Sequence, residues 1–187
     1  MALIGITGTL GSGKGTVVEY LVNTKGFVYF SVTAFLRAEV ERRGITPNRI
    51  AYHDLANEYR MQGSTRLMEA VYRSALPVLA RRESVVIEAQ HTPEEVRFIQ
   101  SKGGIEFAVD AAIETRYRRI TARGSEKDRV TFEAFKEIEE RELSGREVHE
   151  QNLRGAIEAA DYRLTNDGTL EELHQQIDRA LVASQKI

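Results

Sequence analysis

The chain has 187 residues, which is enough for one domain with a sizeable core. It contains no cysteine, which excludes disulfides and thiolate metal sites, and no apolar run approaches the length of a membrane span. A net charge of −2 gives no basic field that would attract nucleic acid or anionic lipid, so we expect neither a nucleic-acid nor a membrane partner. The first residues enter a strand pattern without a leader signal, so a cytoplasmic location is the default expectation.

Short apolar runs alternate with helical patterns along the chain. The runs predict strands at Leu3–Thr7, Phe27–Phe30, Val85–Glu88, Ile105–Val109 and Tyr162–Thr165. Apolar periodicity predicts helices near residues 15–24, 33–43, 49–62, 65–82, 94–101, 114–123, 132–144 and 170–183. The alternation favours a single α/β domain over residues 1–187, with a parallel sheet and helices on both faces. Ligands of such sheets bind beyond the carboxyl ends of the strands.

The turn after the first predicted strand carries the most specific motif. Residues Gly8–Thr16 read Gly-Thr-Leu-Gly-Ser-Gly-Lys-Gly-Thr and lead into a helix. Glycines let backbone N–H groups curl around phosphates, the helix N-terminus favours anions, and a lysine adds a full charge. The turn therefore predicts an ATP site with Mg²⁺ as the charge partner, and Thr16 as a contact to the metal shell. The residues predicted to bind the nucleotide here are Gly8, Gly11, Ser12, Gly13, Lys14, Gly15 and Thr16.

A phosphoryl transferase also needs groups that hold the acceptor, and we expect them on residues 33–82. Arg37 follows the second predicted strand and is a candidate for an acceptor phosphate, as is Arg60 on a later helix. Glu88 ends the third predicted strand, where a carboxylate can face the metal shell through a water. His91 follows three residues later and is a further candidate for the acceptor site.

Residues 116–131 are rich in arginine and predict a small lid that folds over phosphates and excludes water. Arg119 and Arg123 are the predicted catalytic arginines, acting with Lys14 on the transferring group. The same stretch also contains Arg116, Arg118 and Arg129, and we expect one or two of these arginines to pair with nearby glutamates instead.

Asn166-Asp167-Gly168 forms a turn between the last predicted strand and a helix that begins with a capping pattern at Thr169. Thr92-Pro93-Glu94-Glu95 starts an earlier helix with the same pattern. In a fold of this type the Asn166–Gly168 turn lies beside the phosphate loop, so Asn166 and Gly168 are candidates for contact with adenine.

In these motifs the chain resembles nucleoside monophosphate kinases of the adenylate kinase type. Gly8–Thr16 resembles their phosphate loop, Ser31–Arg37 the segment that opens their monophosphate site, and Arg119–Arg123 the entry to their lid. The C-terminal part is similar to dephospho-coenzyme A kinases and to kinase-like domains fused to deoxycytidylate deaminases. The resemblance implies a three-layer phosphate-loop NTPase fold with a central parallel five-stranded sheet.

Two departures from these families bear on the acceptor. Ala34 stands where they usually have an aspartate, and Glu88-Ala89 where they usually have Asp-Gly with a nearby arginine. A hydroxyl acceptor benefits from a carboxylate base, whereas a phosphate acceptor is already ionised and needs none. Ala34 therefore favours transfer of the γ-phosphoryl of ATP to a nucleoside or deoxynucleoside monophosphate.

Two alternatives stay open at this point, while the oligomeric state is not predicted. One is a small-molecule kinase similar to dephospho-coenzyme A kinase, and the other is a nucleotide-binding regulator with little catalysis. A mechanical ATPase is disfavoured because the chain is short and has no recognisable coupling region.

Overall fold

The computed structural model describes residues 1–122, 131–144 and 151–185. Its strands are β1 (Leu3–Gly8), β2 (Val28–Ser31), β3 (Val85–Glu88), β4 (Ile105–Asp110) and β5 (Tyr162–Thr165). They form one five-stranded sheet in the order β2-β3-β1-β4-β5, in which every neighbouring pair is parallel. The predicted parallel five-stranded sheet is therefore confirmed.

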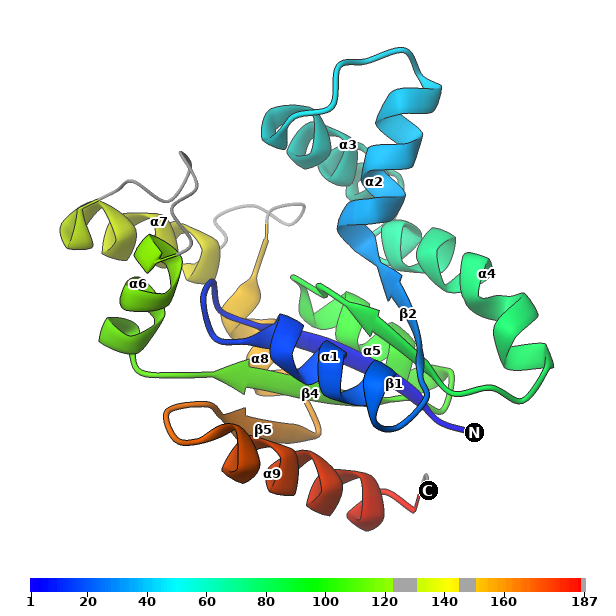
Figure 1. The fold of residues 1–187 in the computed structure, drawn as a ribbon. Coiled ribbons are helices and arrows are strands. Elements are labelled where there is room, and N and C mark those ends of the chain that lie inside the picture. Colours follow the sequence, from blue (N-terminus) through cyan, green and yellow to red (C-terminus); the bar gives the residue numbers. More distant parts are fainter. Residues whose placement is uncertain (123–130, 145–150, 186–187) are drawn as a thin grey trace.

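Helices connect the strands and lie on both faces of the sheet. Their bounds are α1 (Lys14–Asn23), α2 (Val32–Arg42), α3 (Arg49–Gln62), α4 (Arg66–Ala80), α5 (Pro93–Ser101), α6 (Ile113–Ala122), α7 (Phe132–Ser144), α8 (Leu153–Ala159) and α9 (Leu170–Ala183). Figure 1 shows α1 and α9 on one face and α5 and α8 on the other, with α2 and α3 rising as an arm above the sheet. This is the three-layer α/β fold that the sequence predicts.

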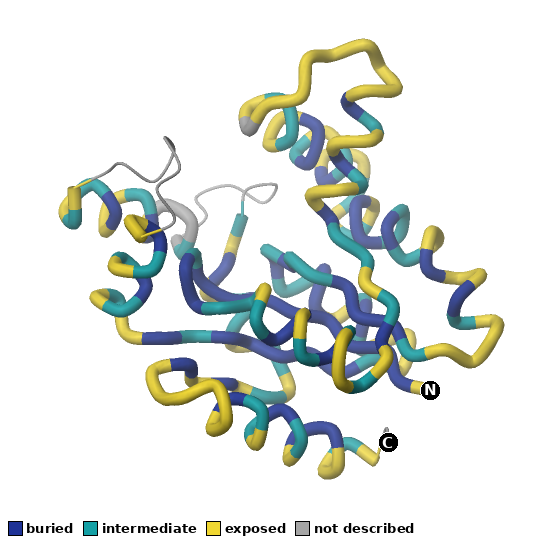
Figure 2. The backbone as a smooth tube through the Cα atoms, in the orientation of Figure 1, coloured by how far each residue is buried: buried dark blue, intermediate teal, exposed yellow. Residues whose placement is uncertain are grey.

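The two faces of β1 belong to two separate apolar clusters, because neighbouring side chains of a strand point to opposite faces. Ile4 and Ile6 pack with α1 and α9, while Leu3 packs with helices of the opposite layer. Buried residues concentrate on the strands and on the inner sides of the helices (Figure 2). The sheet is thus a rigid base that fixes the positions of the turns at its carboxyl edge.

Helix α8 is the element that sequence reasoning missed. Asn152 caps it, because the Asn152 side chain accepts a hydrogen bond from the backbone N–H of Gly155 at 2.9 Å. The helix has 7 residues and contains a glycine, so its apolar pattern is too short to stand out in the sequence.

The two predicted capping patterns differ in outcome. Thr169 and Glu172 form the full reciprocal capping box at the start of α9. Thr92 caps α5 through the N–H of Glu95 at 3.2 Å, but the Glu95 carboxylate accepts from the N–H of His91 at 2.8 Å instead of from Thr92. The Glu95 carboxylate thus bonds to the residue before the N-cap rather than to the N-cap itself, because it also pairs with Arg60.

Across the described ranges, none of the helices combines the length and apolarity needed to cross a membrane.

Candidate functional site

The turn between β1 and α1 is held in a conformation that glycine alone adopts easily. Gly8, Gly11 and Gly13 have φ values of 141°, 78° and 100°. A Cβ on Gly8 would lie 2.1 Å from the carbonyl oxygen of Val109, and one on Gly13 would lie 2.0 Å from Nδ2 of Asn166. The glycines therefore allow both the curl of the loop and its close packing against neighbouring segments.

Lys14 is the first residue of α1 and folds back over the loop. Its Nζ donates hydrogen bonds to the backbone oxygens of Gly8 at 2.8 Å and Thr9 at 2.9 Å. The ammonium group therefore lies inside the curve of the loop, where a polyphosphate would meet it.

The start of α1 fits an anionic ligand. Its N-cap Gly13 supplies no side-chain cap and its first turn holds no acidic residue, so the helix dipole is not offset locally. A Cβ on Gly15 would have no atom within 4 Å, so the space over the first turn is open. Ser12 Oγ is buried and has no hydrogen-bond partner among the described residues. Thr16 lies in the same turn, and these residues together would hold a triphosphate.

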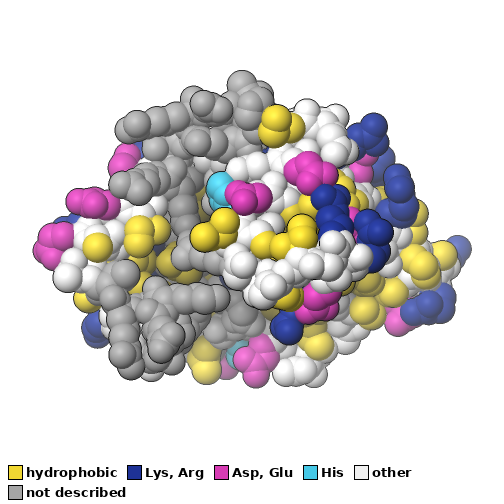
Figure 3. Space-filling model, turned by 90° about the horizontal axis from the view of Figure 1, so that it is seen from above, with side chains coloured by type: hydrophobic (Ala, Val, Ile, Leu, Met, Phe, Trp, Pro, Cys, Tyr) yellow, Lys and Arg dark blue, Asp and Glu magenta, His cyan; other side chains and the backbone are white. Residues whose placement is uncertain are grey.

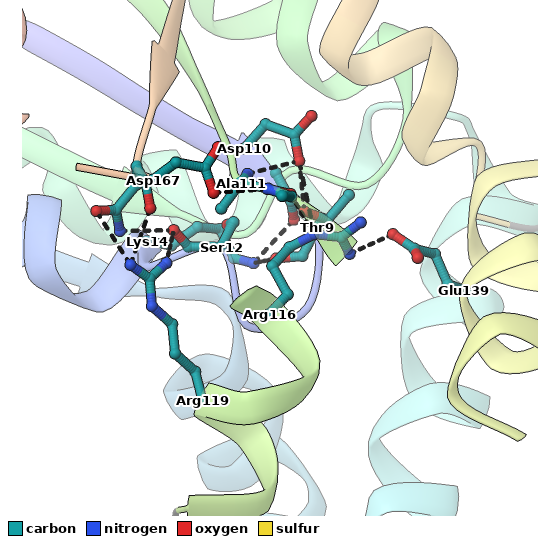
Figure 4. Close-up of polar contacts among 12 residues, drawn as sticks. Thr9, Ser12, Lys14, Asp110, Ala111, Arg116, Arg119, Glu139 and Asp167 are labelled. Carbon is teal, nitrogen blue, oxygen red and sulfur yellow. Dashed lines mark hydrogen bonds and ion pairs between the residues drawn. The ribbon is translucent and has the colours of Figure 1, made fainter. Parts of the chain in front are cut away.

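Asp110, at the end of β4, connects the loop to its surroundings (Figure 4). Its Oδ1 accepts hydrogen bonds from Thr9 Oγ1 at 3.0 Å and from the N–H of Ala111 at 2.9 Å. Its backbone oxygen accepts from the N–H of Asn166 at 2.8 Å. Sequence reasoning did not single out Asp110, although its position at the carboxyl end of a strand beside the loop was an available signal.

The Asn166 turn lies directly beside the phosphate loop. Asn166 Nδ2 donates to the backbone oxygen of Ser12 at 2.8 Å, so this amide braces the loop. Arg119 on α6 donates to the backbone oxygens of Asn166 at 2.8 Å and Ser12 at 3.4 Å. Gly168 precedes the N-cap of α9 in the same turn. The structure thus brings Arg119, Asn166 and the loop together.

Arg116 also lies near the loop, but it is buried and paired. Its Nη1 donates to Glu139 of α7, and its Nε donates to the backbone oxygen of Ala111 at 2.7 Å. Arg118 is exposed and donates to Thr115 at 3.2 Å. The predictions for Arg123 and Arg129 lie outside the described residues, as does the 123–130 part of the predicted lid at 116–131.

The arginines of α2 are exposed and paired with glutamates. Arg37 contacts Glu41 at 3.0 Å with 66% of its side chain exposed, and Arg42 contacts Glu39 at 2.6 Å. Lys and Arg side chains gather over this side of the molecule when it is seen from above (Figure 3). Such surface pairs contribute little stability and exchange partners easily, so Arg37 remains available to a bound anion.

Arg60 is placed differently, inside the protein. Its Nε contacts the Glu95 carboxylate at 2.9 Å, and the two side chains are 2% and 0% exposed. Arg60 Nη1 is buried without a hydrogen-bond partner in the described part of the chain. The guanidinium is therefore committed to Glu95 on one side and offers one unused donor on the other.

Glu88 ends β3 and is held by Tyr29 of β2. The Tyr29 hydroxyl donates to Glu88 Oε2 at 2.5 Å. Burial and this carboxylate raise the pKa of Tyr29 to about 12, so the phenol keeps its proton. The next residue, Ala89, has a φ of 88°. This φ lies in the left-handed region. The families that the chain resembles usually have glycine at this position.

His91 lies in the turn after β3, close enough to Lys14 and Arg60 to feel both charges. Burial and the nearby charges of Arg60 and Lys14 lower the pKa of His91 to about 3, so the imidazole is neutral at physiological pH. Its Nδ1 is buried and unpartnered among the described residues. His91 therefore offers a hydrogen bond rather than a charge.

The α2–α3 arm also has a surface groove of about 550 Å³. Its lining residues are Arg43, Ile45, Asn48, Ile50, Ala51, Asp54, Leu55 and Glu58. The α2–α3 connection lies at the end of the arm away from the β1–α1 turn (Figure 1), so this groove is separate from the phosphate loop.

The sheet order, the glycine loop and the contacts of Lys14 with that loop define the class: a P-loop protein with a kinase-like fold. The chain belongs to the family described as an AAA domain, whose model matches residues 4–145, and to the UPF0200 proteins. It is 32% identical over 183 residues to a UPF0200 protein of Pyrobaculum aerophilum, with 96% of this chain and 97% of the relative covered. A UPF0200 protein of Methanothrix thermoacetophila is 30% identical over 179 residues, covering 95% and 94%.

Solved structures with the same fold include TT1252 from Thermus thermophilus, with a TM-score of 0.61 and 24% identity over 97% of this chain and 96% of that one. A shikimate kinase from Bacteroides thetaiotaomicron has a TM-score of 0.59 and 15% identity, with 98% of each chain covered. A gluconokinase from Sinorhizobium meliloti has a TM-score of 0.57 and 16% identity, covering 97% and 92%. They support the P-loop kinase fold, while the narrower resemblance to the adenylate kinase type stays a prediction.

Proposed function

We propose that this protein is an ATP-dependent phosphotransferase that moves the γ-phosphoryl group of ATP to a nucleoside or deoxynucleoside monophosphate. The observation that carries the proposal is the curled glycine loop with Lys14 Nζ between the Gly8 and Thr9 carbonyls at the uncapped start of α1. Such a loop binds the phosphates of a nucleoside triphosphate.

In this proposal ATP supplies the phosphoryl group and Mg²⁺ neutralises part of its charge when both are bound. Lys14 exchanges its two carbonyl contacts for phosphate oxygens, and the first-turn N–H groups of α1 orient the triphosphate. Arg119 reaches the loop from α6 and stabilises the charge of the transferring group. Thr16 on α1 and Glu88 at the end of β3 are the residues that would help to hold the Mg²⁺ and its waters.

The bond between the γ-phosphorus and its bridging oxygen breaks, and an acceptor oxygen forms the new bond to phosphorus. A monophosphate acceptor is already ionised near neutral pH and needs no base, which agrees with alanine at position 34. Arg37, whose partner Glu41 lies at the surface, would hold the acceptor phosphate. His91 and the unused Arg60 donor would bind the acceptor from the α3 side.

The second candidate is a kinase with a small hydroxyl acceptor, of which dephospho-coenzyme A is one example. The buried pairing of Arg60 with Glu95 favours it, because one of the two arginines suited to an acceptor phosphate is already largely neutralised. The kinase neighbours named for shikimate and gluconate have acceptors of this kind. The acceptor hydroxyl would donate a hydrogen bond to the unpartnered Nδ1 of neutral His91, and its proton would leave on a phosphate oxygen, because a pKa of about 3 makes His91 a weak base.

An acceptor panel tests these proposals. The protein is incubated with ATP, Mg²⁺ and single acceptors: the monophosphates of ribo- and deoxynucleosides, dephospho-coenzyme A, shikimate and gluconate. Phosphorus NMR then identifies the phosphorylated product. A nucleoside diphosphate product supports the first candidate, and a phosphorylated hydroxyl compound replaces it with the second. Tight ATP binding without product from any acceptor would instead favour a nucleotide-binding regulator.

A further inference from the structure

The phosphate loop is contacted by Asp110 at the end of β4 and by Arg116 of α6. Thr9 Oγ1 bonds to Asp110 Oδ1 at 3.0 Å, and that same oxygen lies 3.8 Å from Arg116 Nε. A Cβ on Gly11 would lie 2.8 Å from the backbone oxygen of Arg116, so the loop also packs directly on this turn of α6. Arg116 therefore faces the loop through both its side chain and its backbone.

The other end of the Arg116 guanidinium reaches α7. Nη1 donates to Glu139 Oε1, and the two side chains are 8% and 9% exposed. Figure 4 shows Arg116 extending between Asp110 and Glu139. The guanidinium carbon also lies 6.0 Å from the ring centre of Phe135 on α7. A planar guanidinium with donors in fixed directions can connect two carboxylates in this way, which a lysine cannot do.

Apolar packing fixes the relative position of α6 and α7. The Tyr117 ring lies 5.1 Å from that of Phe132 and 5.7 Å from that of Phe135. Phe135 and Ile120 are each only 1% exposed. A change in α7 therefore displaces Glu139, and Arg116 must follow because an unpaired buried charge is costly.

We propose that Arg116 and Glu139 are positioning residues through which α7 sets the conformation of the phosphate loop, by way of Asp110 and Thr9. The proposal deepens the proposed function, because it makes nucleotide affinity depend on the docking of α7. It assigns Arg116 a role distinct from the phosphate contact expected of a lid arginine. The loop, the end of β4, α6 and α7 then respond as one unit, joined by the Thr9–Asp110 and Arg116–Glu139 hydrogen bonds and by the 3.8 Å ion pair between Arg116 and Asp110.

Hydrogen exchange of the ligand-free protein tests the proposal independently of any nucleotide. Glu139→Gln keeps an acceptor for Arg116 but removes the charge, and Glu137→Gln on the exposed side of α7 is the matched control. We expect amides of residues 8–16 to exchange about tenfold faster in Glu139→Gln and unchanged in Glu137→Gln. Faster exchange confined to α7, with the loop amides unaffected, would overturn the proposal.

Calorimetry of Mg²⁺-ATP binding adds a double-mutant cycle between Thr9 and Glu139, the first and last residues of this series of contacts. Thr9→Val and Glu139→Gln should each weaken binding, by about tenfold, and the double variant should be no weaker than the worse single one. Thr9→Ser, which keeps the hydroxyl, should restore affinity. Independent, multiplying effects would contradict the coupling.

A stability control separates positioning from folding. Arg116→Met with Glu139→Met replaces the buried pair by apolar side chains, which often preserves stability. We expect this double variant to unfold near the parent temperature. The amides of residues 8–16 should nevertheless exchange as fast as in Glu139→Gln. Loop exchange at the parent rate in a folded double variant would overturn the proposal. If the parent itself binds no Mg²⁺-ATP, the proposed function fails, while the exchange experiment still decides whether α7 sets the loop.

Discussion

Arg60 on α3 and Glu95 on α5 form an ion pair of 2.9 Å with side-chain exposures of 2% and 0%. The pair joins the α2–α3 arm to α5, the helix that follows β3. Glu95 also accepts the N–H of His91 at 2.8 Å, so the same carboxylate orders the turn beside the phosphate loop. This buried pair thus acts with the apolar packing of Leu36 and Leu55 to fix the position of the arm relative to the loop.

Removal of Arg60 alone should destabilise the protein strongly. Arg60→Met leaves Glu95 buried without its cation, and we expect a loss of about 3–5 kcal/mol in the free energy of unfolding, measured by urea denaturation. Arg60→Met combined with Glu95→Met should recover much of that loss. Arg66→Met is the matched control, because Arg66 and Glu69 are 57% and 32% exposed and should contribute at most about 1 kcal/mol. Equal losses in both arginine variants would contradict this assignment.

Lys14→Ala should abolish most phosphoryl transfer and weaken ATP binding while the fold persists. Lys14 donates to the backbone oxygens of Gly8 and Thr9 inside the curve of the loop, so its loss removes a positive charge from the ligand site. Isothermal titration calorimetry with Mg²⁺-ATP measures the effect. Lys25→Ala, which breaks a pair with Asp178 at the opposite end of α1, should leave affinity unchanged. Full turnover in Lys14→Ala would refute the proposed role of the loop.

Ala89→Gly should stabilise the protein. The φ of 88° is unfavourable for a residue with a Cβ by about 1–2 kcal/mol. Glycine removes this strain, but it loses more conformational entropy on folding, which costs about 0.5–1 kcal/mol. We therefore expect a net gain of up to about 1 kcal/mol, visible as a higher melting temperature. Ala38→Gly, at an exposed position inside α2, should have the opposite sign, since glycine disfavours a helix interior. A lower melting temperature for Ala89→Gly would show that the turn is not strained there.

Glu106 should make stability fall as pH rises. Its carboxylate is fully buried in β4 without a hydrogen-bond partner among the described residues, and burial, with nearby Asp161 and Glu95, raises the pKa of Glu106 well above 4.5. The folded protein holds a proton that the unfolded chain releases above about pH 4.5. Stability is therefore greatest below that pH and declines toward the folded-state pKa, by up to about 1.4 kcal/mol per pH unit.

Urea denaturation across pH 5 to 7, roughly the range above the unfolded-state pKa, measures this slope. Glu106→Gln cannot ionise and should lose that part of the dependence, whereas Glu137→Gln on the surface of α7 should keep it. The same slope in Glu106→Gln and in the parent would contradict a buried neutral carboxyl at this position.

The sheet and the phosphate loop could be predicted because their signals are local. Alternating apolar runs give parallel strands, and Gly8–Thr16 combines strand, glycine turn and helix start within a few residues. The partners of the arginines could not be predicted in this way. Apolar periodicity shows which face of a helix is buried, but it does not show which distant carboxylate will meet a buried arginine.

The sequence by itself determined that the chain forms a parallel α/β sheet with a glycine-rich phosphate-loop turn, since adjacent residues specify both. Only the tertiary structure decided that Arg60 meets Glu95, Arg116 meets Glu139 and Arg119 meets Asn166. In each of these pairs the two residues are at least 23 positions apart in the chain. Their geometry comes from the packing of whole helices on the sheet, and a buried guanidinium must find its acceptor wherever that packing places one.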